Sequence, residues 1–270
     1  MTHPAFQPNA IALVTGAAQG IGFALSEHFI RLGLRVAMND ITDLTGKTEA
    51  LGGNALACPG DISTAEGRTA VADRISAVWD GPVTVLVNNA VTRTGRGWEA
   101  PLSEWREAVD VNLWGPLELI RLFEPGMIAS GIPSMVLNVG SKQGITNPPG
   151  HPAYNMVKAA LKSLTEGLEH RYRSLDAPIS AHLLVPGWTS DDPDKWAKGA
   201  WSSEQVAEFA VQRLSGGAFY IVCPDGETSE AMDAQRIAWG AGDITENRPA
   251  LSRWHPDWKD AFAKDAADST

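Results

Sequence analysis

Short runs of apolar residues alternate along the chain with longer segments in which apolar residues recur at the spacing of a helix. The short runs predict strands at Ile11–Thr15, Arg35–Asn39, Asn54–Cys58, Thr84–Asn88, Ser134–Val139, Ile179–Val185 and Phe219–Cys223. Several are continuously apolar, which is typical of strands buried on both faces of a parallel sheet. The longer segments predict helices near Gly20–Leu32, Ala65–Trp79, Leu102–Ile120, Pro152–Leu175 and Ser203–Leu214. This alternation predicts an α/β fold: a Rossmann-type, doubly wound sheet of seven parallel strands.

The 270-residue chain changes character after its last predicted strand. We expect residues 1–223 to form a single α/β domain. Residues 224–270 hold one helical pattern near Ser229–Trp239 and then loop-like sequence. We expect them to form a C-terminal extension that packs on the same domain or on a neighbouring subunit.

Composition and charge narrow the class of protein. The net charge is −10 and no block of Lys and Arg stands out, so we expect no nucleic-acid partner. The chain contains no run of about 18 apolar residues, so we expect no membrane span. Its first residues do not show the pattern of a signal peptide, so none is expected. The two cysteines, Cys58 and Cys223, end apolar runs and are expected to be buried free thiols, which suits the cytoplasm. We predict no metal site.

A glycine cluster follows the first predicted strand and precedes the first predicted helix. Glycines there permit a tight turn and a close approach of the backbone to a diphosphate, and the helix directs its positive end at that anion. The candidate residues are Gly16, Gln19, Gly20, Ile21 and Gly22. Structural turns also use glycine, so the cluster alone indicates a dinucleotide site only weakly.

Asp40 ends the second predicted strand, 18 residues after Gly22. A carboxylate at that point can accept both hydroxyls of an adenosine ribose and would repel a 2′-phosphate, which favours NAD over NADP. Lys47 is a nearby cation that would oppose this preference. The alternative is that Asp40 is simply an exposed residue at a strand end.

Tyr154 and Lys158 are spaced i and i+4, so on a helix they face the same side. A nearby ammonium favours the phenolate over the phenol, which fits Tyr154 as a general acid/base. Ser141 follows the fifth predicted strand and can hold a substrate oxygen beside the tyrosine. Each of these features is common by itself.

Together, these features resemble the short-chain dehydrogenase/reductase family in its compact single-domain branch. The resemblance covers about residues 10–223, in the order and at the spacing of the family. It rests on TGAAQGIG at 15–22, Asp40, Asp61-Ile62, Asn88-Asn89-Ala90, Asn112, Ser141, Tyr154, Lys158 and Pro186-Gly187.

The resemblance implies a role for each matching residue. Asn112, Ser141, Tyr154 and Lys158 are expected to form the catalytic set, with Asn112 in a water chain that refills Tyr154 through Lys158. Lys158 is also expected to bond the nicotinamide ribose. A helix-packing role is the alternative for Asn112.

The remaining matches are expected to hold the cofactor. Asp61 and the Ile62 backbone are expected at the adenine, Asn88 in the centre of the sheet and Ala90 near the adenosine ribose. The segment expected along the nicotinamide comprises Pro186, Gly187, Trp188 and Thr189.

The chain departs from the family pattern at two points. Val91 stands where the family usually has glycine after Asn-Asn-Ala. Asp191 stands where a threonine often follows the Pro-Gly pair, and Thr189 comes two residues earlier. The contact that the family makes between this segment and the cofactor phosphates is therefore not carried over to this chain.

The substrate pocket is expected from loops next to the catalytic residues. These loops nominate Arg93, Gln143, Pro149, His151 and Trp188, of which several can hydrogen-bond or attract an anion. Each also has an ordinary structural alternative as a loop or packing residue. We expect a small polar secondary alcohol: a sugar, a polyol or a hydroxy acid.

Family members usually form dimers or tetramers, so a homodimer or homotetramer is expected. Trp254 and Trp258 of the extension need a place to be buried, for which we expect a subunit interface. We further hypothesise that the extension reaches the active-site mouth of a partner.

Four alternatives compete with an NAD-dependent dehydrogenase. One is a non-catalytic NAD(P)-binding sensor, which commonly loses the Tyr or Lys that this chain keeps. A second is a reductase of an apolar ketone that uses NADPH. A lyase resembling halohydrin dehalogenases is disfavoured by Lys158 and the glycines, and a sugar-nucleotide epimerase by the glycine spacing.

Overall fold

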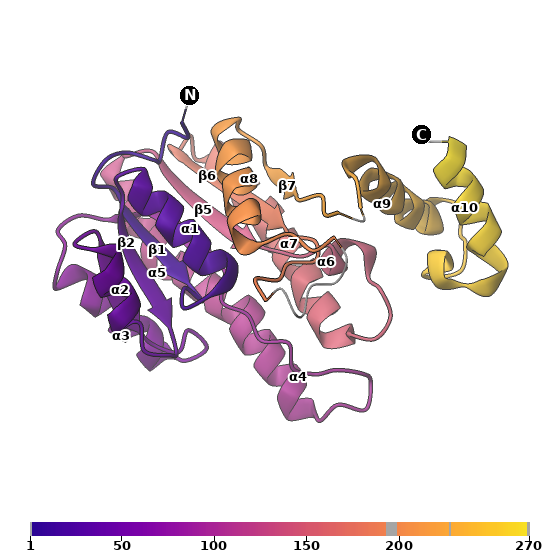
Figure 1. Ribbon diagram of the computed structural model, residues 1–270, viewed down its shortest axis with the longest axis horizontal. Coiled ribbons are helices and arrows are strands. Elements are labelled where there is room, and N and C mark those ends of the chain that lie inside the picture. Colours follow the sequence, from indigo (N-terminus) through magenta and orange to yellow (C-terminus); the bar gives the residue numbers. More distant parts are fainter. Residues whose placement is uncertain (1, 193–198, 227, 269–270) are drawn as a thin grey trace.

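A computed structural model describes residues 2–192, 199–226 and 228–268 (Figure 1). Its centre is a parallel sheet of seven strands in the order β3-β2-β1-β4-β5-β6-β7. The strands are β1 Ile11–Thr15, β2 Arg35–Asp40, β3 Ala55–Pro59, β4 Val83–Asn88, β5 Ser134–Val139, β6 Ile179–Val185 and β7 Tyr220–Val222. The order reverses between β1 and β4, where a doubly wound sheet opens a crevice at the carboxyl ends of its strands.

Helices cover both faces of the sheet, as the continuously apolar strands require. The main helices are α1 Gly20–Arg31, α2 Thr45–Leu51, α3 Ala65–Ser76, α4 Leu102–Val109, α5 Gly115–Ser130, α7 Pro152–Ser174 and α8 Ser203–Ser215. One buried core joins the sheet to α1 and α8, with Phe29 and Leu214 fully buried. The other joins it to α3, α5 and α7 through residues such as Met127 and Tyr172. The fold is therefore the predicted Rossmann-type architecture.

Several element boundaries differ from the sequence prediction. The predicted helix Leu102–Ile120 is divided by a π-helical turn, η1 Asp110–Trp114, between α4 and α5. The helices α2 and α6, Gln143–Thr146, were not predicted because each is too short for apolar periodicity to appear.

The C-terminal extension is more helical than the predicted loop-like sequence. It contains α9 Glu230–Thr245, the short 3-10 turns η3 Ser252–Trp254 and η4 Pro256–Trp258, and α10 Lys259–Asp268. Trp258 and Phe262 pack edge-on against Trp239, at 6.4 and 5.3 Å between ring centroids. The extension thus buries part of its aromatic surface on itself, so a subunit interface is not required for Trp258.

Figure 1 shows α9 and α10 side by side, beyond the edge of the sheet that carries β7. A contact between α6 and α9 joins this pair to the loop that follows β5. Within the described ranges, no helix combines the length and the apolar character that crossing a bilayer requires.

Candidate active site

The glycine cluster forms the turn between β1 and α1, with Gly16 and Gly20 at positive φ. A Cβ at Gly16 would lie 2.8 Å from the Ala90 Cα, and one at Gly22 would lie 2.4 Å from the Asn89 amide nitrogen. That amide donates to the carbonyls of Thr15 and Gly16, at 2.8 and 3.0 Å. Only glycine fits these two positions, so β4 holds the turn open at the crevice of the sheet.

The helix that follows leaves its N-terminus available to an anion. Gln19 precedes α1 without a side-chain cap, and no acidic residue lies in the first turn. The backbone N–H groups of that turn therefore keep hydrogen-bonding capacity and a positive dipole end. The turn and the helix end fit the diphosphate of a dinucleotide.

Asp40 lies beside this turn at the end of β2, and its side chain is half-buried. One carboxylate oxygen accepts from the Ala18 N–H at 3.1 Å, and the other accepts from the backbone N–H and the hydroxyl of Thr42, at 3.1 and 3.0 Å. Lys47 donates to the Ala18 carbonyl at 2.5 Å. Asp40, expected at the adenosine ribose, and Lys47, the cation that would oppose its preference for NAD, therefore both bond the backbone of Ala18.

Asp61 and Ile62 follow β3 at the same edge of the sheet. The Asp61 carboxylate accepts from the backbone N–H and the hydroxyl of Ser63, at 2.9 and 2.7 Å. Ile62 is buried, and its carbonyl accepts from Arg68 at 2.7 Å. Asn39, which the sequence did not single out, donates to the Cys58 and Gly60 carbonyls at 2.9 Å each.

Asn88, at the end of β4, belongs to a buried chain of polar side chains. Its amide donates to Asn138 of β5 at 2.8 Å, and Asn138 donates to Thr165 of α7 at 2.9 Å. The next residues of β4 close on β1, because the N–H groups of Asn89 and Ala90 both donate to the Thr15 hydroxyl at 3.0 Å. These contacts fix the middle of the sheet to the helix that carries Tyr154.

Tyr154 and Lys158 lie on the first turns of α7, both buried. The Lys158 ammonium donates to the Val139 carbonyl at 2.7 Å and lies 5.7 Å from the centroid of the Tyr154 ring. The Arg93 guanidinium lies 5.6 Å from the same centroid. Burial, with the Arg93 charge as a smaller cause, lowers the pKa of Lys158 to about 7.

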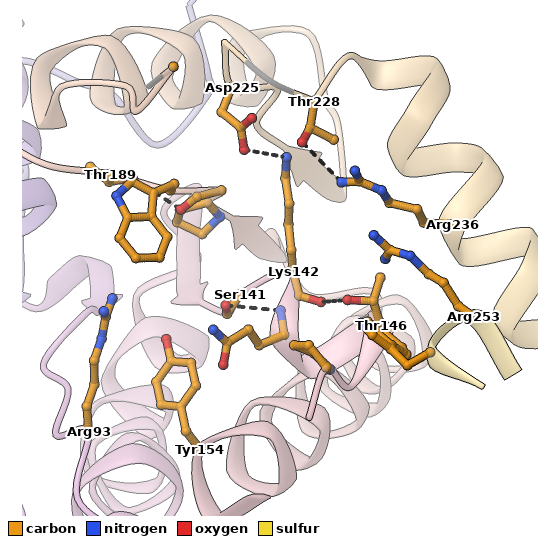
Figure 2. A pocket seen from close by; sticks show the side chains of 17 residues that line it. Arg93, Ser141, Lys142, Thr146, Tyr154, Thr189, Asp225, Thr228, Arg236 and Arg253 are labelled. Atoms are coloured by element: carbon orange, nitrogen blue, oxygen red, sulfur yellow. Dashed lines mark hydrogen bonds and ion pairs between the residues drawn. The ribbon is translucent and has the colours of Figure 1, made fainter. Parts of the chain in front are cut away.

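Ser141 follows β5 and faces the same space (Figure 2). Its hydroxyl accepts from the Gln143 N–H at 3.2 Å, and it retains a proton to donate. The Gln143 Oε1 is buried without a hydrogen-bond partner among the described residues. Both side chains can therefore hydrogen-bond a polar ligand.

Asn112 lies in the π-helical turn η1, a feature often found at functional sites. Its amide donates to the carbonyls of Thr92 and Ala108, at 3.1 and 2.8 Å, and its Oδ1 accepts from the Thr92 N–H at 3.3 Å. The turn contacts α7. The side chain thus holds the loop after β4. These hydrogen bonds are the ones expected of the helix-packing alternative, and the role of Asn112 in a water chain stays a prediction.

A cavity of about 450 Å³ opens beside the Tyr154 hydroxyl. Of the residues nominated for the pocket, Arg93, Gln143 and Trp188 line it, whereas His151 and Pro149 do not. His151 instead precedes α7 as its N-cap residue, and Pro148 takes the lining position of the loop. The segment expected along the nicotinamide lies on the cavity wall, through Pro186, Gly187, Trp188 and Thr189.

The segment after Pro186-Gly187 carries a carboxylate in place of the family's threonine. The Asp191 carboxylate accepts from the N–H and the hydroxyl of Ser203, at 2.7 and 2.5 Å, at the start of α8. The Thr189 hydroxyl donates to the Gly187 carbonyl at 3.4 Å. Neither side chain offers a free donor to a phosphate in this arrangement.

Several cavity residues come from parts of the sequence that motif reasoning did not reach. They are Lys142, Thr146, Pro148, Gly199, Asp225, Thr228, Arg236, Arg253 and Trp254. Arg253 and Trp254 belong to the C-terminal extension, which therefore reaches the cavity of its own chain. The predicted contact with a partner's active site stays a prediction. Lys142 carries a sequence signal, because it directly follows Ser141. Trp254 stands out only as a large aromatic residue of the extension, and Arg236 and Arg253 carry no signal.

The comparisons agree with this fold. Residues 10–197 match the family model described as short chain dehydrogenase. The chain therefore belongs to the short-chain dehydrogenase/reductase family, a family of oxidoreductases that use a nicotinamide cofactor.

Similar proteins include dehydrogenases. The 1-deoxy-11-beta-hydroxypentalenate dehydrogenase of Streptomyces avermitilis is 33% identical over 193 residues, covering 67% of this chain and 68% of that protein. Glucose 1-dehydrogenase 2 of Bacillus subtilis is 30% identical over 184 residues, covering 65% of this chain and 70% of that protein.

Solved structures share the fold at lower identity. A short-chain dehydrogenase/reductase from Burkholderia phymatum in complex with NAD has a TM-score of 0.78 at 23% identity, and covers 89% of this chain and 96% of that one. The L-sorbose reductase of Gluconobacter frateurii, complexed with NADPH and L-sorbose, has a TM-score of 0.72 at 22% identity, and covers 83% and 98%.

Proposed function

We propose that the protein is an NAD(H)-dependent dehydrogenase that interconverts a small polar secondary alcohol and its carbonyl. The observation that supports this most directly is the placement of Tyr154. Its buried ring lies at the cavity, with the Lys158 ammonium 5.7 Å from its centroid and Ser141 on the same wall.

In the proposed reaction, Tyr154 exchanges a proton with the substrate oxygen. During oxidation its phenolate accepts the hydroxyl proton, and during reduction its phenol donates a proton to the carbonyl oxygen. The nicotinamide supplies the hydride acceptor or donor. The Ser141 hydroxyl donates a hydrogen bond to the substrate oxygen, and the Lys158 ammonium favours the phenolate and binds the nicotinamide ribose.

Asp40 supports the choice of NAD. We propose that its carboxylate accepts the adenosine ribose hydroxyls and repels a 2′-phosphate. Asp61 and the Ile62 backbone hold the adenine, Ala90 lies near the ribose, and the segment 186–189 lines the nicotinamide. Lys47, bonded to the Ala18 carbonyl, favours the competing possibility of an NADPH-dependent reductase.

The substrate class is inferred from the polar groups in the cavity. Arg93 and Gln143 offer hydrogen bonds, and Trp188 offers a flat apolar face. The names of two similar proteins, a glucose dehydrogenase and a hydroxypentalenate dehydrogenase, fit a sugar, a polyol or a hydroxy acid.

The test is a screen of aldoses, polyols, hydroxy acids and apolar alcohols with NAD and NADP in parallel. We expect turnover of a polar alcohol with NAD. Activity confined to long apolar or steroid-like alcohols would overturn the substrate class, and a strong NADP preference would overturn the role of Asp40. Tight cofactor binding without turnover of any alcohol would favour the sensor.

We also propose that the protein is a cytoplasmic homodimer or homotetramer. Apolar side chains on α4 and η1 support an assembly, since Leu102 is 63% and Trp114 49% exposed. Light scattering after size exclusion would measure the mass, and a monomer at micromolar concentration would contradict the proposal.

A further inference from the structure

The wall of the cavity opposite Tyr154 comes from the C-terminal extension. In Figure 2, Arg93 and Tyr154 lie on one side of the cavity, and Arg236 and Arg253 project from the other. Arg236 belongs to α9 and Arg253 to η3, both beyond the last strand. A substrate held at Tyr154 would therefore extend toward two guanidinium groups.

The charges around the cavity do not cancel. Four cations line it, namely Arg93, Lys142, Arg236 and Arg253, whereas Asp225 is the acidic residue among the described lining positions. The Lys142 ammonium is already held by two carboxylates, Asp225 at 3.1 Å and Asp233 at 2.7 Å. The whole chain carries a net charge of −10, so this local surplus of positive charge is a specific feature of the cavity.

The two tail arginines differ in how far their charges are already compensated. Arg236 donates to the Thr228 hydroxyl at 3.0 Å and lies 3.9 Å from an Asp233 carboxylate oxygen. Arg253 has no hydrogen bond or ion pair among the described residues. Its guanidinium lies near two rings, Trp254 at 4.8 Å and Phe262 at 5.3 Å from their centroids. Burial and the Arg236 charge lower the pKa of Arg253, the Asp233 charge acts in the opposite direction, and the group remains a cation.

The extension holds Arg253 in place through its neighbour Ser252. The Ser252 N–H and hydroxyl both donate to the Asp243 carboxylate, at 3.0 and 2.5 Å, and the Trp239 indole donates to the same hydroxyl at 2.7 Å. Arg248 lies across the Trp239 ring at 4.0 Å and pairs with Asp243 at 3.2 Å. These contacts hold the backbone from which Arg253 projects, and a guanidinium with unused donors is suited to bind an anion.

We propose that Arg253, assisted by Arg236, binds the carboxylate of the substrate, so that the enzyme acts on a hydroxy acid or keto acid rather than on a neutral sugar or polyol. This inference rests on the proposed dehydrogenase function. One guanidinium without an ion pair among the described residues matches one negative charge, which favours a carboxylate over a phosphate dianion. The reacting carbon lies at Tyr154 and the carboxylate at the tail.

The kinetic test uses secondary hydroxy acids whose hydroxyl and carboxylate are separated by one to five carbons, each paired with its carboxamide. We expect wild type to prefer the acid at one chain length. In Arg253→Met, kcat/KM for that acid should fall about 10- to 100-fold, the usual worth of a charged hydrogen bond, while that for the amide stays unchanged. Arg253→Lys should recover part of the loss, which also controls for folding. Lys259→Met removes an exposed charge from the same segment and should have no effect.

A second arm does not depend on turnover. Ligand-observed NMR would measure the binding of butyrate, butyramide and propyl phosphate to the NAD-loaded protein. We expect butyrate to bind, and its binding to be lost in Arg253→Met and kept in Lys259→Met. Binding of butyrate without oxidation of any alcohol would refute the dehydrogenase function and leave the anion site standing.

Three outcomes would overturn the anion site. The first is equal kcat/KM for acid and amide in the wild type. The second is tighter binding of propyl phosphate than of butyrate. The third is a loss of acid preference in Arg93→Met but not in Arg253→Met. If the wild type turns over acid and amide equally well, the anion site is excluded but the proposed dehydrogenase function stands.

Discussion

The ammonium of Lys142, the residue after Ser141, lies 2.7 Å from the Asp233 carboxylate of α9. Its side chain is 16% exposed, and those of its partners Asp233 and Asp225 are 6% and 10% exposed. One cation therefore ties the loop of the proposed catalytic serine to the C-terminal extension. A Cβ on Gly187 would lie 3.0 Å from this ammonium. Lys142 therefore also packs against the segment that is expected along the nicotinamide.

Lys142→Met should destabilise the protein, because it removes the cation that two poorly exposed carboxylates share. We expect the free energy of unfolding in urea to fall by about 3 kcal/mol, as for a partner removed from a buried ion pair. Lys162→Met is the matched control, since the Lys162–Glu166 pair is 33% and 35% exposed and should be worth less than about 1 kcal/mol. Equal losses in the two variants would contradict the role of Lys142.

Asp40→Ala should shift the cofactor preference toward NADP. It removes the acceptor for the ribose hydroxyls and the charge that repels a 2′-phosphate. We expect the NADP-to-NAD ratio of kcat/KM to rise about 100-fold, corresponding to about 3 kcal/mol. Lys47→Met should move the ratio in the opposite direction. An unchanged ratio in Asp40→Ala would exclude Asp40 from cofactor selection.

Arg93→Met should raise the pKa of Lys158, because it removes the like charge that adds to the effect of burial. Lys158 is protonated below a pKa of about 7 and loses its charge above it. If the charged form is the active one, kcat/KM falls as pH rises through this value, and the fall should move to higher pH in the variant. Arg96→Met, on the same loop, is the control. Identical pH profiles of Arg93→Met and the wild type would show that the Arg93 charge does not affect the pKa of Lys158.

Acid should destabilise the fold through His3. Burial and the His182 charge lower the pKa of His3 to about 4, and burial also lowers the pKa of His182. Because the folded-state pKa lies below the unfolded one, this contribution is complete above pH 6.5 and is lost as pH falls from 6.5 to 4. A difference of 2.5 pH units corresponds to about 3 kcal/mol.

Urea unfolding between pH 4 and 7 would measure how steeply the free energy of unfolding decreases as pH falls. This decrease should be shallower in His3→Leu and unchanged in His255→Gln, which alters a partly exposed histidine of the tail. A slope that His3→Leu leaves unchanged would place the acid sensitivity elsewhere.

The sequence predicted the strands and the doubly wound fold because their physical signals are local. A short apolar run marks each strand. Glycines such as Gly16 and Gly22, where the neighbouring chain leaves no room for a Cβ, mark the turn after the first strand. The spacing of Tyr154 and Lys158 is likewise local to one helix.

The rest depends on tertiary contacts. The π-helical turn at Asn112 interrupts a pattern that reads as one continuous helix. Arg236 and Arg253 lie on elements beyond the last strand, and one tie that brings these elements to the cavity is the pair of Lys142 with Asp233 of α9. These two residues are about ninety positions apart, and no motif records their contact. His151 precedes α7 and is not among the cavity-lining residues, because the direction of the loop after Pro148 is not encoded by spacing.

The most direct test of the proposed mechanism is Tyr154→Phe. With the alcohol found in the screen, we expect kcat to fall about 10²- to 10⁴-fold, the usual contribution of a general acid/base, while the dissociation constant for NADH stays close to that of the wild type. Tyr220→Phe, which alters an exposed tyrosine bonded to Glu166, should leave both unchanged. A kcat of Tyr154→Phe close to that of the wild type would contradict the mechanism.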